Sequence, residues 1–262
     1  MQRLNKWLHG FLQYRNLLWQ LVIRDLKIKY RRSFLGYLWS VLNPLMIMLV
    51  MTVVFSTMFK RNIENFPVYL LSGQVMFNFM TNSTGQGMRS ILGSAGLLKK
   101  TYVPKYIFTL AKVTSGLVDF LLSLGALALV MIFTGVNPTR YILLTPFVLL
   151  QLYIFCIGLG LFLAQATVFF RDIQYIYSVI TTAWMYLTPI FYPSDMLPPW
   201  LLNAIKIFNP MYCYIAEFRS VILYGWMPAT HLWVYGNVVA FLCLLIGTAS
   251  FLWSQDRFIL YI

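Results

Sequence analysis

The sequence predicts an all-α integral membrane protein with six transmembrane helices, an N-terminal amphipathic interface helix, and short re-entrant helices between spans 5 and 6. Two observations indicate this class. Of the 262 residues, 60% are hydrophobic and 10% are charged, whereas soluble domains carry about 25% charged residues. Runs without Asp, Glu, Lys or Arg recur along the chain, and the first extends from Ser33 to Phe59. Such a run can cross a hydrocarbon core about 30 Å thick as a helix, so residues 1–262 are expected to form one transmembrane domain.

Residues 1–33 are expected to form an amphipathic helix in the cytoplasmic interface. Apolar side chains recur there at the spacing that places them on one helix face; they are Leu4, Trp7, Leu8, Phe11 and Leu12. The end of the segment is basic, with Arg24, Lys27, Lys29, Arg31 and Arg32 against the single acid Asp25. Positive charge beside a span marks its cytoplasmic side. A plain lipid anchor and a helix with a functional role are both compatible with this pattern.

The six spans are expected over residues 35–59, 67–88, 106–134, 141–170, 173–191 and 232–253. An even number of spans places both termini in the cytoplasm, and most of the 20 Lys and Arg residues then lie on that side, as the positive-inside rule requires. Residues 89–105 form a basic excursion on the inner side. Residues 193–229 are apolar pieces interrupted by prolines, too short for a full crossing, which indicates re-entrant or interfacial helices on the outer side.

Span 2 carries four amides at four-residue spacing, namely Gln74, Asn78, Asn82 and Gln86. They form one polar stripe on the helix. Amides facing lipid are unfavourable, so the stripe faces other helices or water. Hydrogen bonding between helices explains it, and so does the lining of a path for a hydrophilic substrate. We assign Gln74, Asn78 and Asn82 to a predicted translocation path.

Span 3 contains two ionisable residues, Lys112 and Asp119, seven positions apart on one face with Ser115 and Ser123. Ionisable groups inside a span are functional candidates. A structural pair packed between helices is the alternative.

Span 5 carries aromatic residues at seven-residue spacing, namely Tyr177, Trp184 and Phe191. Aromatic faces beside hydroxyl groups suit sugar rings, because these rings have apolar C–H faces and polar rims. Interfacial belts are the alternative, but Trp184 falls in the middle of the span. We therefore add these three residues to the predicted translocation path.

The sequence offers little for catalysis. It has two histidines, no HExxH, no clustered carboxylates and no GxxxxGK[ST], so no catalytic residue and no metal site is predicted. Any ATP hydrolysis is expected on another chain, and this chain is expected to hold no cofactor. The net charge of +13 is typical of basic cytoplasmic loops facing anionic membrane lipids, so nucleic acid is not an expected partner.

Three blocks of sequence resemble a known family. They are RDLKIKYRRSFLGYLWSVLNPL (24–45), GLLKKTYVPK (96–105) and QATVFFRDIQYIYSVITTAWMYLTPIFYP (165–193). In this order they are similar to the membrane, or permease, subunits of type-two ABC exporters. The branch that they resemble exports lipid-linked O-antigen, capsular polysaccharide and teichoic acid.

The resemblance implies a homodimer around a central path in the cytoplasmic (inner) membrane. Each copy would engage an ABC ATPase subunit that holds ATP and Mg²⁺. The N-terminal helix would act as a gate, and residues 193–229 would form the outer re-entrant region. Residues 89–105 would contain the coupling helix, with ATPase contacts at Leu97, Leu98, Lys99, Lys100, Tyr102 and Val103. We further hypothesise that the basic block Arg24, Lys27, Lys29, Arg31 and Arg32 attracts the head group of a lipid-linked polysaccharide.

Three other functions would account for some of the same residues. Within the family, an exporter of drugs or small lipids is the main alternative. A membrane-embedded glycosyl or acyl transferase would share the aromatic and basic residues, but it needs carboxylates near one face that the sequence lacks. A secondary transporter would show internal repeats, and none is evident.

Overall fold

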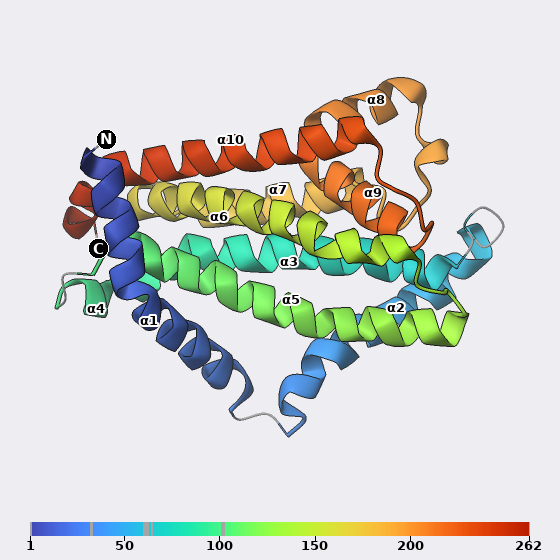
Figure 1. The fold of residues 1–262 in the computed structure, drawn as a ribbon, viewed down its shortest axis with the longest axis horizontal. Coiled ribbons are helices and arrows are strands. Elements are labelled where there is room, and N and C mark those ends of the chain that lie inside the picture. The colour runs from blue at the N-terminus through green and yellow to red at the C-terminus, as the bar shows by residue number, and fades with distance from the viewer. Residues whose placement is uncertain (1, 32–33, 60–62, 64, 101–102, 262) are drawn as a thin grey trace.

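Long helices running side by side form the body of the molecule, which confirms the predicted all-α class (Figure 1). The computed structural model describes residues 2–31, 34–59, 63, 65–100 and 103–261, and only the backbone of residues 2–13 and 56–59. Helix α10 (Thr230–Ser254) packs along α6 (Thr145–Phe169). Helix α3 (Phe66–Gly93) packs along both α5 (Tyr106–Thr134) and α6. A continuous apolar core lies between these four helices.

Helix α1 (Gln2–Tyr30) crosses one end of the bundle (Figure 1). Its Leu21 and Val22 are buried in a second apolar cluster with Ile107 of α5 and Phe251 of α10. The predicted apolar face at Leu4, Trp7, Leu8, Phe11 and Leu12 lies outside the described side chains. The part of α1 with described side chains therefore docks on the bundle through its apolar residues, as an amphipathic helix does.

Helix α2 (Trp39–Phe59) follows α1 after a single 3-10 turn, η1 (Gly36–Leu38). Gly36 has a φ of +50°, a left-handed conformation that glycine adopts without steric cost. Helix α2 packs on α3 and α5 but is largely exposed: only 11% of its most apolar window is buried. The open face of α2 is apolar, which suits lipid or a further protein surface.

Within the described residues, four helical stretches are long and apolar enough to cross a membrane: Gly36–Phe55, Tyr106–Thr134, Arg140–Phe169 and Thr230–Leu260. These correspond to predicted spans 1, 3, 4 and 6. Helix α3 has 28 residues, about 42 Å at 1.5 Å per residue, but its amides lower its mean hydropathy below that of the other four. It also continues to Gly93, beyond the predicted end of span 2 at residue 88. The count of six spans stays a prediction.

The helical part of span 5 is shorter than predicted. Helix α7 (Ile173–Leu187) ends four residues before the expected limit at residue 191, and its 15 residues extend about 22 Å. The cause is Pro189, because a residue before proline avoids the α-helical conformation. Thr188 is accordingly extended, with φ of −88° and ψ of 130°.

The segment after α7 contains two short helices at the end of the bundle opposite to α1, α8 (Pro199–Phe208) and α9 (Pro210–Ile222) (Figure 1). Neither is long enough to cross a bilayer. Arg219 of α9 is fixed in the interior, donating to the carbonyls of Pro189 at 2.8 Å and Tyr69 at 3.0 Å. It thereby joins α9, the break after α7 and the start of α3. The Arg219 side chain itself is buried.

The opposite end of the bundle gathers three separate parts of the chain. Helix α4 (Ala95–Leu98) lies there with the start of α1 and the 3-10 turn η4 (Gln255–Leu260) (Figure 1). The segment predicted to contact an ATPase thus shares one end of the molecule with both described ends of the chain.

Candidate functional site

Two ion pairs of opposite polarity join α1 to α5. The Nζ atom of Lys29 lies 2.6 Å from Oδ2 of Asp119, and the Nζ atom of Lys112 lies 2.9 Å from Oδ2 of Asp25. Asp25 also contacts Arg24 at 3.1 Å. Lys112 and Asp119 were expected either to act in function or to form a structural pair. In the structure each pairs with a residue of α1.

Tyr30 extends this contact to α2. Its hydroxyl donates to Oδ1 of Asp119 at 2.8 Å and also hydrogen-bonds the hydroxyl of Ser40. Asp119 therefore receives a lysine and a tyrosine from adjacent positions of α1. Burial alone would lower the pKa of Lys29, but the hydrogen bond and the negative charge of Asp119 outweigh burial, so its pKa is raised. The charged form of Lys29 is thus favoured.

Two cavities meet at the Lys29–Asp119 pair, and both are lined by Lys29, Gln86 and Asp119. The first, which we call the amide cavity, has a volume of about 320 Å³ between α1, α2, α3 and α5. The second, which we call the charged cavity, has a volume of about 390 Å³ between α1, α3 and α5. Arg24, Asp25, Lys112 and Ser115 line only the charged cavity.

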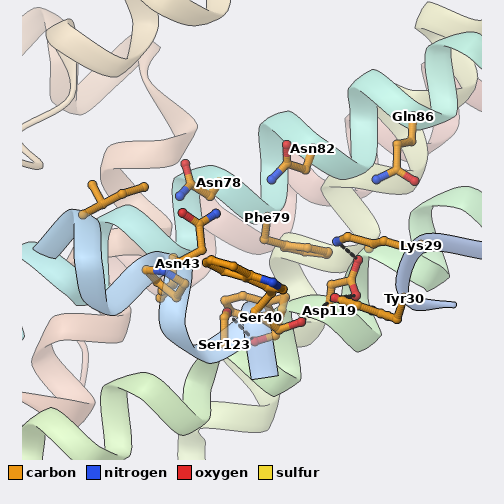
Figure 2. A pocket seen from close by; sticks show the side chains of 16 residues that line it. Lys29, Tyr30, Ser40, Asn43, Asn78, Phe79, Asn82, Gln86, Asp119 and Ser123 are labelled. Carbon is orange, nitrogen blue, oxygen red and sulfur yellow. Dashed lines mark hydrogen bonds and ion pairs between the residues drawn. The ribbon is translucent and has the colours of Figure 1, made fainter. Parts of the chain in front are cut away.

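The polar stripe of α3 lines the amide cavity. Figure 2 shows Asn78, Asn82 and Gln86 in a row along this helix, with the Lys29–Asp119 pair near the Gln86 end. Asn43 of α2 faces the same cavity near Asn78. The predicted path residue Gln74 does not line it; this side chain is 7% exposed and its Oε1 has no hydrogen-bond partner among the described residues. The structure thus brings together two of the three amides assigned to the path.

The aromatic residues predicted for the path make contacts within the protein and line neither cavity. The Tyr177 hydroxyl hydrogen-bonds Thr84 at 2.6 Å in the interior. The indole N–H of Trp184 donates to Asn209 at 2.7 Å, and Phe191 stacks on Phe55. Seven-residue spacing correctly placed Tyr177 and Trp184 on one face, but that face packs against the rest of the chain. Their place in a translocation path stays a prediction.

The basic block lies at the end of α1 as expected. Arg24, Lys27, Lys29 and Arg31 are exposed, and Arg32 lies outside the described residues. Arg24 and Lys29 line the charged cavity, whereas Lys27 and Arg31 line neither cavity. Sequence reasoning missed that Lys112 of α5 adds a further positive charge to this site.

The predicted coupling residues divide into exposed and buried positions. Leu97, Lys99 and Lys100 are exposed, and Val103 is half-buried. Leu98 is only 6% exposed and packs in the apolar cluster beneath α1. Tyr102 lies outside the described residues. The exposed positions present a basic surface at the end of the bundle that also carries α1.

The chain is similar in sequence to known proteins over most of these helices. A family model described as ABC-2 type transporter matches residues 16–223. The O-antigen export system permease protein RfbA of Myxococcus xanthus is 34% identical over 210 residues, which cover 80% of this chain and 81% of that protein. The protein of the same name from Klebsiella pneumoniae is 29% identical over 77% of this chain and 78% of its own length. The polysialic acid transport protein KpsM of Escherichia coli is 22% identical over 88% of this chain and 90% of its own length. The matched region runs from the second half of α1 to α9 and contains every residue that lines the two cavities.

Proposed function

Because the chain belongs to the ABC-2 type transporter family, we propose that it is the transmembrane subunit of an ATP-driven exporter that moves a lipid-linked cell-surface polysaccharide across the cytoplasmic membrane. The observation that carries this proposal is the likeness to O-antigen export permeases over about four-fifths of the chain. The likeness to a polysialic acid transport protein adds a capsule-type polymer to the same class. A multi-pass membrane protein with polar cavities between its helices suits this work.

The exporter would be a homodimer of this chain with two copies of an ABC ATPase subunit, which would hold ATP and Mg²⁺. Four helical stretches of this chain are apolar enough to cross a membrane, and the exposed apolar faces of α2 and α7 are available for a second copy. The exposed residues Leu97, Lys99 and Lys100 near α4 would contact the ATPase, with both termini in the cytoplasm. A rigid-body movement of the ATPase subunits would then act on α4 and on α1 together, because both pack on one apolar cluster.

Surface labelling of the polymer tests this proposal. Cells that lack the gene are expected to keep the polysaccharide inside and to lose it from the surface, and the intact gene is expected to restore it. A catalytically dead ATPase subunit should give the same internal accumulation, because the energy comes from that partner. Normal surface polymer in the deletion strain would contradict the proposed function.

A further inference from the structure

The charged cavity contains more positive than negative groups. Arg24, Lys29 and Lys112 face Asp25 and Asp119 there, and Asp25 is shared between Arg24 and Lys112. Charged side chains of α1 and α5 both contribute, while α3 contributes the neutral Gln86. A phosphate group has several oxygens and can bind more than one cation at once. It is therefore the kind of ligand that can replace the carboxylates on these three cations.

The amide cavity has a different chemistry. Four side-chain amides face it, from Asn43, Asn78, Asn82 and Gln86. None of them makes a side-chain hydrogen bond within the part of the chain that the structure describes. Amides are both donors and acceptors, and leaving them without a partner in an apolar environment is unfavourable. The cavity is thus suited to a polar, uncharged ligand or to water.

Aromatic side chains complete the amide cavity. Trp39 and Phe79 line it beside the amides, and Figure 2 shows Phe79 directly below the row of amides. An aromatic face with nearby hydrogen-bonding groups matches a sugar ring. A volume of about 320 Å³ lies within the range of small-molecule sites, about 300–1,000 Å³.

The Lys29–Asp119 pair lines both cavities and is open to water on its Lys29 side. The side chain of Lys29 is 52% exposed, and an ion pair open to water contributes little to stability. An anion that binds Lys29 in place of Asp119 would join the two cavities, because both are lined by these residues and by Gln86.

We propose that the two cavities are adjoining subsites for one substrate, a phosphate group in the charged cavity and its attached sugar in the amide cavity, with the Lys29–Asp119 pair as the partition that the phosphate displaces. This inference rests on the proposed function, since it assigns subsites to a lipid-linked sugar. It gives Lys112 and the amides direct contacts with the substrate. Asp119 is a positioning residue that holds Lys29 until the phosphate arrives.

Binding to the full complex with its ATPase subunit, in lipid nanodiscs, tests the proposal. The probes are a polyprenyl diphosphate and the same lipid carrying one N-acetylglucosamine. Lys112→Gln is expected to weaken the binding of both lipids ~10-fold, the size of one charge-assisted hydrogen bond. Asn82→Leu is expected to weaken only the sugar-bearing lipid, by ~5-fold. Asp119→Asn is expected to tighten the binding of the sugar-free lipid, a gain that misfolding cannot produce.

Two exposed positions outside both cavities supply matched controls. Arg15→Gln removes a charge from α1, and Asn203→Leu removes an amide from α8; neither should change binding of either lipid. Equal weakening of both lipids by Asn82→Leu would overturn the subsite assignment, and so would unchanged binding in Lys112→Gln.

Competition with inorganic diphosphate shows whether the ligand is a lipid head group or a soluble phosphate. Diphosphate is expected to displace the lipid only at far higher concentration than the lipid itself, and displacement at equal concentration would overturn the assignment to a head group. Failure of the intact complex to bind either lipid would instead refute the proposed function, and the subsites with it. If the intact complex binds both lipids but the variants affect both lipids equally, only the subsite assignment is refuted.

Discussion

The Nζ atom of Lys29 lies 2.6 Å from the carboxylate of Asp119 although 90 positions separate the two residues. The contact fixes the end of α1 on the middle of α5. A second pair, Asp25 with Lys112, reverses the charges one helical turn earlier on α1. This alternation favours one register of α1 on α5, because a shifted register would bring like charges together.

Reversal of one charge tests this register. Lys29→Glu places two carboxylates together and is expected to lower the free energy of unfolding by about 0.5–1 kcal/mol, since the pair is partly exposed. The double variant Lys29→Glu with Asp119→Lys restores the attraction and is expected to recover most of the loss. Thermal unfolding of the purified protein in detergent measures both. Arg15→Glu is the control on the same helix, and equal stability of Lys29→Glu and this control would contradict the register argument.

The sequence placed Lys112 and Asp119 on one face of a helix but could not identify their partners. Helical periodicity reports which residues share a face, whereas the partner of that face depends on where a distant helix docks. For α5 the partner is α1, whose docking depends on the buried Leu21 and Val22. The four amides of α3 were predicted as one stripe for the same local reason, and three of them line one cavity.

The same limit explains the aromatic residues of α7. Tyr177 and Trp184 are seven positions apart and share a face, as predicted, but Thr84 and Asn209 cover their polar groups. Nothing local distinguishes a face that lines a path from one that packs on another helix. The end of α7 was predictable, because Pro189 disfavours helix at Thr188. Arg219 also had a local signal, because it and Glu217 are the two charged residues of a helix α9 that is otherwise mostly apolar.

Arg219 is expected to be the most sensitive arginine for stability. Its guanidinium donates to three carbonyls, those of Pro189, Tyr69 and Ile190, and it lies over the Tyr69 ring. Arg219→Ala removes all three hydrogen bonds and the contact with the Tyr69 ring, and is expected to cost about 3–5 kcal/mol. Arg171→Ala, at an exposed turn, is the control and is expected to cost less than about 0.5 kcal/mol. Equal unfolding temperatures for the two variants would show that Arg219 does not join α9 to α3.

Two helical glycines are expected to respond to alanine in opposite directions. A Cβ atom at Gly247 would lie 2.0 Å from the carbonyl oxygen of Gly158, since α10 and α6 are in backbone contact there. Gly247→Ala is therefore expected to destabilise the protein by about 1–3 kcal/mol. A Cβ at Gly85 meets nothing within 4 Å, so Gly85→Ala is expected to stabilise α3 by about 0.5–1 kcal/mol. Thermal unfolding distinguishes the two signs, and a stabilising Gly247→Ala would contradict the α6–α10 contact.

Cysteine crosslinking to the ATPase subunit tests the coupling region. Leu97→Cys and Lys99→Cys are expected to crosslink, because both positions are exposed at the end of α4. Leu98→Cys is the matched negative control, because this position is 6% exposed in the apolar cluster. Crosslinks only from position 98, or from none of the three, would contradict the proposed ATPase contact.

We propose that this chain forms the path for a lipid-linked polysaccharide that an ATPase drives across the membrane. The direct measurement is ATP-dependent movement of a lipid-linked polysaccharide across the membrane of proteoliposomes that contain both subunits. We predict movement that requires ATP and both chains, and that slows when the charged cavity is altered by Lys112→Gln. A complex that hydrolyses ATP and moves none of the O-antigen or capsule-type polymers offered to it would contradict the proposed function.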